Sequence, residues 1–104
     1  MEKTANQHKV ADVIADTLFA QGISQVFGIT GAGNIQIFDA LARHGGFNFV
    51  FTHHEQAAVM AANTYYRSTG KLALALVTTG GGSTNALTGV VSSNMDSIPV
   101  LIIA

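Results

Sequence analysis

The stretch Phe51–Gly70, FTHHEQAAVMAANTYYRSTG, decides the fold of this chain, because a strand ends in it and a helix begins at once. Glu55 stands at the start of that helix. Residues 56–66 carry no charge, and four of them are alanines. Surface helices usually carry charged residues on one face, so this pattern predicts a helix buried on most sides. The helix dipole alone also favours a glutamate at this position, so position by itself leaves the role of Glu55 open.

The composition limits the chain to one domain or less, since it has only 104 residues. Charged residues make up 11%, against roughly 25% in ordinary soluble domains, which suggests a surface covered by further chain or a partner. The net charge of −1 gives no reason to expect nucleic acid. Without cysteine there is neither a disulfide framework nor thiolate chemistry, and we expect a cytoplasmic location. We expect no membrane span, because the uncharged run 72–95 is broken by glycine and polar residues.

Hydrophobic spacing predicts alternating helices and strands along the whole chain. The run Leu72–Val77, LALALV, is continuously apolar, as in a strand of a parallel sheet covered on both faces. The fold class is therefore α/β, a three-layer, doubly wound parallel sheet. A buried strand at the end, with no helix after it, leads us to expect an incomplete sheet and the N-terminal fragment of a longer enzyme. We predict helices at about 7–21, 35–44, 55–70 and 84–94, and strands at about 25–29, 47–51, 72–77 and 99–104.

Three loops follow the first three predicted strands, at 30–34, 52–55 and 78–85. In a parallel sheet they meet at the carboxyl edge, where such folds bind ligands. Two of them are rich in glycine, which allows close approach of backbone to a ligand, and the third supplies Glu55. His53 and His54 make no metal site, since neighbours on an extended chain point in opposite directions. We expect Asn34 to cap the helix that follows it.

One interpretation of the first loop is a dinucleotide-binding unit, because Gly31-Ala32-Gly33 follows a strand and opens a helix. The third glycine of that fingerprint would fall at Gln36, and no acidic residue stands cleanly at the tip of the second strand. A partial G-x-G pattern favours this interpretation only weakly.

The other interpretation comes from five ordered motifs that together resemble a known family. The chain resembles the N-terminal pyrimidine-binding domain of thiamine-diphosphate-dependent enzymes of the acetolactate synthase, pyruvate oxidase and benzaldehyde lyase group. The resemblance covers about Lys9 to Ala104. It rests on FGITG at 27–31, FDAL at 38–41, HEQAA at 54–58 with Tyr65, Arg67 and TGK at 69–71, VTTGGGSTN at 77–85, and MDSIP at 95–99.

The resemblance implies that Glu55 hydrogen-bonds N1′ of the aminopyrimidine of thiamine diphosphate. That bond would favour the imino tautomer, which takes the proton from C2 of the thiazolium and so forms the ylide. Thr30 and Gly31 would lie beside the pyrimidine. Thr78, Gly81 and Asn85 would line the same pocket.

The chain departs from the family at Thr30 and Gly81, where the family usually has proline. It departs again at Thr64 and Tyr66, which replace the usual glycine and alanine. Benzaldehyde lyase also has three glycines in the second loop, as at 80–82 here. It has a catalytic histidine at the position of Gly33, so its particular chemistry is not implied.

For the complete protein, the resemblance implies a thiamine-diphosphate-dependent lyase or transferase acting on 2-keto acids or aldehydes, by acetolactate-synthase-like carboligation or decarboxylation. A C-terminal domain outside this chain would hold the diphosphate and its Mg²⁺, and the site would form with that domain of another subunit of a homodimer or homotetramer. Whether a flavin binds, and which substrate is used, stay open. The chain alone is then expected to be inactive. The alternative is a catalytically silent α/β binding or assembly module.

Overall fold

The computed structural model describes residues 9–104, and the helices and strands alternate throughout them, as predicted. The first two residues of the predicted helix 7–21 lie outside this range. Predicted and observed bounds of most elements agree within about three residues. The elements are α1 (Val10–Ala20), β1 (Gln25–Gly28), α2 (Ile35–His44), β2 (Asn48–Phe51), α3 (Glu55–Thr69), β3 (Leu74–Leu76), α4 (Gly81–Met95) and β4 (Leu101–Ile103).

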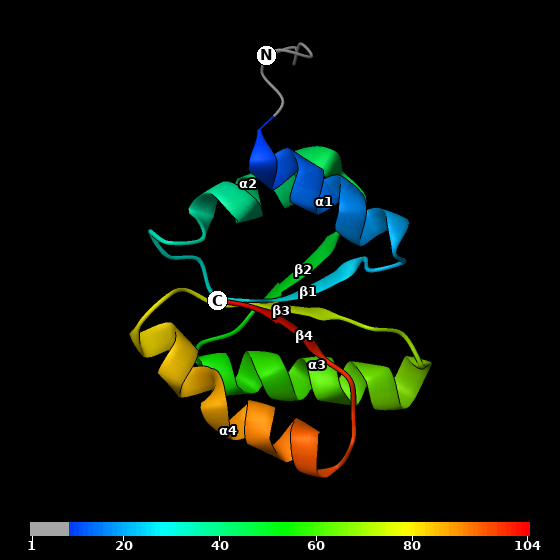
Figure 1. Ribbon diagram of the computed structural model, residues 1–104, viewed down its shortest axis with the longest axis vertical. Helices are drawn as coiled ribbons and strands as arrows, with labels where there is room; N and C mark the ends of the chain where they lie inside the picture. Colours follow the sequence, from blue (N-terminus) through cyan, green and yellow to red (C-terminus); the bar gives the residue numbers. More distant parts are fainter. Residues whose placement is uncertain (1–8) are drawn as a thin grey trace.

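The four strands form one parallel sheet in the order β2-β1-β3-β4. Helices α1 and α2 cover one face of the sheet, and α3 and α4 cover the other (Figure 1). This is the predicted three-layer, doubly wound α/β fold. Strand β2 lies on one side of β1 in the sheet, and β3, which comes later in the chain, lies on the other side. The connections therefore diverge at the carboxyl ends of β1 and β3, where folds of this kind bind their ligands.

The core lies in two layers, one on each face of the sheet. Strand β3 belongs to both, since Leu74 and Leu76 pack toward α1 and α2 while Ala75 packs toward α3 and α4. All three residues are fully buried, which confirms the prediction from the apolar run 72–77. Between residues 9 and 104, no helix combines the length and the apolar character that crossing a bilayer requires.

Helix α3 buries one side and exposes the other, so the prediction of burial on most sides is wrong for this chain by itself. Ala58, Val59 and Ala62 are fully buried against the sheet and α4. Ala57 and Met60 face outward and are exposed, and the sequence places no charge beside them before Arg67. The absence of charged residues at 56–66 had suggested burial. In the described structure, the outward-facing residues among them form an exposed surface without charge instead.

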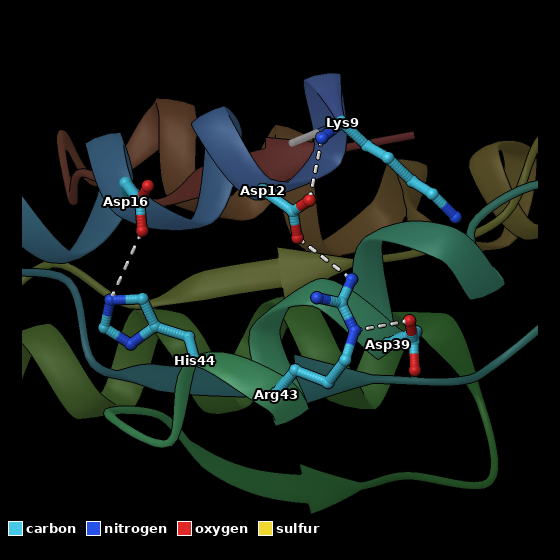
Figure 2. Close-up of polar contacts among 6 residues, drawn as sticks. All are labelled: Lys9, Asp12, Asp16, Asp39, Arg43 and His44. Atoms are coloured by element: carbon cyan, nitrogen blue, oxygen red, sulfur yellow. Dashed lines mark hydrogen bonds and ion pairs between the residues drawn. The ribbon is translucent and has the colours of Figure 1, made fainter. Parts of the chain in front are cut away.

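A charged cluster joins α1 to α2 on the opposite face of the sheet (Figure 2). The Asp12 carboxylate is 3% exposed; it lies 2.9 Å from the Arg43 guanidinium and accepts a hydrogen bond of 2.8 Å from the Lys9 backbone. Arg43 also donates to Asp39 at 2.8 Å. The hydrogen bonds of Arg43 with the Asp39 carboxylate and, second in size of effect, with the Asp12 carboxylate raise the pKa of Arg43. His44 approaches Asp16 at 3.7 Å.

We predict that Arg43→Ala lowers the thermal midpoint of the chain more than Asp39→Asn does. The first change removes the cation that faces the buried Asp12 carboxylate, and a buried charge is costly when it loses its partner. The second removes a partner that is itself largely exposed, and surface ion pairs contribute little. Thermal unfolding followed by circular dichroism compares the two variants. Because Arg43→Ala removes both pairs and Asp39→Asn only one, equal losses would show that the pair with Asp12 contributes nothing to stability.

Helices α3 and α4 run in the same direction on one face of the sheet (Figure 1). The contacts between their residues follow a regular line. The contacts recur about every four residues on both helices, as expected for faces one helical turn apart. We call this line the α3–α4 seam. Its four pairs are Glu55–Asn85 at the carboxyl edge, Val59–Gly89, Asn63–Ser93 and Arg67–Asp96.

Candidate functional site

The candidate site lies at the carboxyl edge of the sheet, where the segments after β1, β2 and β3 come together. Glu55 is half-buried and opens α3 directly after the segment that follows β2. The turn before it is fixed by its own side chains: His54 Nδ1 accepts a hydrogen bond of 3.0 Å from the Gln56 backbone N–H. Thr52 Oγ1 donates to the His54 carbonyl at 2.9 Å. His54 is therefore the helix cap that sets the direction in which Glu55 leaves the backbone.

The Glu55 carboxylate is held between two residues of α4. Asn85 Nδ2 donates to Oε1 at 3.2 Å. The other oxygen, Oε2, faces Gly82, where an added Cβ would lie only 3.3 Å from it. The same Cβ would lie 3.0 Å from Thr78 Cγ2. Glu55 and Thr78 can therefore pack this closely against α4 only because residue 82 has no side chain.

Thr78 joins the loop after β3 to the loop after β1. A Cβ on Gly31 would lie 3.0 Å from Thr78 Cβ, and one on Gly33 would lie 2.9 Å from Thr78 Oγ1. The two glycines thus let the loops pack in direct contact. Ser83 Oγ holds the Thr78 segment from the other side by donating to its carbonyl at 3.1 Å.

The structure thus brings together four of the six predicted site residues. Glu55, Asn85, Thr78 and Gly31 form one continuous set of contacts through Gly82. The other two lie on the same segments but outside this set of contacts. Thr30 is exposed, as Asn85 also is, and a Cβ on Gly81 would meet nothing within 4 Å.

Helix α4 begins at Gly81, three residues before the predicted start at residue 84. The glycine run was interpreted as a loop, but Gly81, Gly82 and Ser83 form the first helical turn. Gly80 supplies the turn into the helix with a φ of 72°, and its carbonyl accepts from the Thr84 backbone N–H at 3.1 Å. The free N–H groups of this first turn therefore lie beside the candidate site.

Asn34 holds the first loop of the candidate site, although its position in the sequence predicted a helix cap. It does stand at the N-cap position of α2, but its side chain makes no capping bond. Its Oδ1 instead accepts from the Gly31 backbone N–H at 2.8 Å, and its Nδ2 donates to the Ile29 carbonyl at 3.1 Å. Because Asn34 is only 4% exposed, these bonds fix the loop that contacts Thr78. The signal in the sequence was an asparagine closing a short strand-to-helix loop that contains glycine.

The chemistry available at this edge is that of one carboxylate among neutral donors. Glu55 can accept hydrogen bonds or carry a proton, and Thr78 and Asn85 add a hydroxyl and an amide. Within residues 9–104, no three His, Cys, Asp or Glu side chains are grouped as a metal site. The arrangement can accept hydrogen bonds from a ligand at the carboxylate and can donate or accept them at the amide and the hydroxyl.

Comparison with known proteins shows the family to which the sequence is similar. Residues 8–104 match the family model described as "Thiamine pyrophosphate enzyme, N-terminal TPP binding domain". The chain is 45% identical over 94 residues to the acetolactate synthase large subunit of Buchnera aphidicola from Schizaphis graminum. It is 44% identical over 94 residues to the acetolactate synthase isozyme 3 large subunit of Escherichia coli, and 37% identical over 95 residues to the chloroplastic acetolactate synthase of Arabidopsis thaliana. These matches cover 90%, 90% and 91% of this chain but only 16%, 16% and 14% of the relatives.

Proposed function

This chain belongs to the family of N-terminal TPP binding domains of thiamine pyrophosphate enzymes, and from that membership we propose that the carboxyl edge between β1 and β3 binds the pyrimidine of thiamine diphosphate. The observation that carries the proposal is the Glu55 carboxylate at this edge, which Asn85 contacts at Oε1 and which lies against Gly82 at Oε2. A pyrimidine ring carries nitrogen donors and acceptors, with which a carboxylate, an amide and a hydroxyl can form hydrogen bonds. The residues present therefore fit the pyrimidine.

Glu55 has the central role in this proposal. Its carboxyl group would hold and exchange a proton at N1′ of the pyrimidine, while His54 and Asn85 fix its direction. Thr30 and Gly31 on the first loop, and Thr78 and Gly81 on the second, would bound the ring. When bound, the cofactor supplies a nucleophilic carbon that adds to carbonyl groups, and the protein supplies position and a proton.

For the complete protein we propose acetolactate-synthase-like carboligation of 2-keto acids. The relatives that match 90% of this chain are acetolactate synthases, and this similarity supports the proposal. The diphosphate and Mg²⁺ would be held outside residues 1–104, by the diphosphate-binding domain of another subunit in a homodimer or homotetramer. The exposed, uncharged side of α3 with Ala57 and Met60 supports such an association, because surfaces of this kind bury against partners.

The test is a chimera in which residues 9–104 replace the matching segment of the Escherichia coli isozyme 3 large subunit. We expect the chimera to produce acetolactate in a manner that depends on thiamine diphosphate. The 104-residue chain alone should produce none and should bind the cofactor weakly in calorimetric titrations with Mg²⁺. A folded chimera that binds cofactor without producing acetolactate would favour a catalytically silent module. Micromolar binding by the chain alone would contradict a diphosphate anchor that lies elsewhere.

A further inference from the structure

We propose that Asn85 is a positioning residue that orients the Glu55 carboxylate, and that close approach of α3 and α4 at Gly89 holds the two side chains in reach. The orientation is a property of this chain without any ligand. Its consequence for the cofactor rests on the proposed function above.

The contact between Glu55 and Asn85 joins residues 30 positions apart on two different helices. A glutamate side chain has several rotatable bonds and loses conformational freedom when it is held in one geometry. The donor from Asn85 engages Oε1 while Oε2 lies against Gly82. Asn85 therefore favours one orientation of the carboxylate.

Gly89 sets how closely the two helices approach, one helical turn beyond Asn85. A Cβ on Gly89 would lie 2.7 Å from Val59 Cβ and 3.4 Å from the Gln56 carbonyl oxygen. Any side chain here would push α4 away from α3, and the 3.2 Å bond between Asn85 and Glu55 would lengthen. The glycine is thus required by the neighbouring helix, at the usual cost of a glycine in a helix interior.

Asn63 and Ser93 fix the register of the same seam one turn further on. Asn63 Nδ2 donates to Ser93 Oγ at 2.9 Å, and the two residues are 8% and 2% exposed. A shift of α4 along α3 would leave these buried groups without partners, which is costly. Arg67 completes the seam by donating to both Asn63 and Asp96 at 2.8 Å. Glu55 and Asn85 therefore meet in one register only.

The first experiment measures the side-chain conformation of Glu55 by NMR in the ligand-free 104-residue chain. Three-bond couplings to Glu55 Cγ should report one dominant rotamer in the unchanged chain and averaged values in Asn85→Ala. Gly89→Ala should average the same couplings although Glu55 and Asn85 are both intact. Asn94→Ala, an exposed asparagine on the same helix, is the matched control and should leave them unchanged. Unchanged couplings in Asn85→Ala would overturn the proposal. If Gly89→Ala fails to fold, the couplings of Asn85→Ala alone test the proposal.

The second experiment measures exchange of the C2 proton of thiamine diphosphate in the chimera, together with cofactor affinity. Loss of one hydrogen bond predicts that Asn85→Ala slows exchange by about tenfold, with affinity little changed. In the Glu55→Gln background the same change should slow exchange no further, because Asn85 acts through Glu55. Additive losses would show that Asn85 acts independently of Glu55 and would overturn the proposal. If Glu55→Gln alone did not slow C2 exchange, the proposed function would be contradicted. The Glu55 couplings measured in the ligand-free chain would still test the role of Asn85.

Discussion

Gly28→Ala should unfold this chain or destabilise it by at least about 3 kcal/mol, well above the usual cost of an added methyl group. Gly28 ends β1, and a Cβ there would collide with the Leu76 carbonyl oxygen on β3. It would also lie 3.2 Å from Phe38 Cζ. The oxygen belongs to the backbone of the central strand pair, so relief requires β1 to separate from β3 at the site. For a domain of this size, the loss corresponds to a fall of more than about 12 °C in the thermal midpoint.

Gly81→Ala is the matched control for this change. A Cβ at residue 81 would meet nothing within 4 Å, and Gly81 does not have a positive φ. Since alanine is favoured over glycine in a helix, the variant should be as stable as the unchanged chain or more stable. Urea unfolding of both variants measures the difference. A Gly28→Ala chain with unchanged stability would contradict the close contact between β1 and β3 at this edge.

The elements themselves were predictable because their signals are local. The apolar run that contains β3 indicated a strand covered on both faces, and the structure confirms it. The helices predicted at 35–44 and 55–70 end in the structure at Gly45 and Gly70, and both glycines adopt the left-handed conformation with φ of 84° and 72°. The role of such glycines can be predicted from their own backbone preferences.

The errors arose where a residue's role is set by a distant neighbour. Gly82 looked like part of a loop, yet it is a helical residue whose missing side chain makes room for Glu55. Asn34 had the features of a helix cap, but the loop preceding it takes both of its hydrogen bonds. The close approach at Gly89 depends on Val59, 30 residues away. No local pattern encodes these contacts.

The place where these segments meet was predicted more accurately than the contacts between their residues. Topology alone placed the segments with Gly31, Glu55 and Thr78 at one edge of the sheet, because parallel strands end together. The pairing of Glu55 with Asn85 depends on how α3 and α4 pack, which the sequence does not show. The exposure of Gly81 likewise follows from where α4 begins.

Glu55→Gln should reduce acetolactate production by the chimera by about 10²–10⁴-fold, the usual contribution of general acid–base catalysis. Glutamine keeps the size of the side chain and an oxygen for Asn85, but it cannot hold and release a proton. Were Glu55 only an acidic residue favoured by the helix dipole, the change would cost about 0.3–1 kcal/mol of stability and leave the rate unchanged. Asp39→Asn, a carboxylate-to-amide change at an exposed position of α2, is the control and should retain full activity.

The most direct test of the role assigned to Glu55 is the rate of hydrogen–deuterium exchange at C2 of thiamine diphosphate, followed by NMR in the cofactor-loaded chimera. The account predicts that Glu55→Gln slows this exchange by about 10²–10⁴-fold while the protein stays folded and keeps its cofactor. An unchanged exchange rate in a folded, cofactor-loaded Glu55→Gln chimera would contradict it.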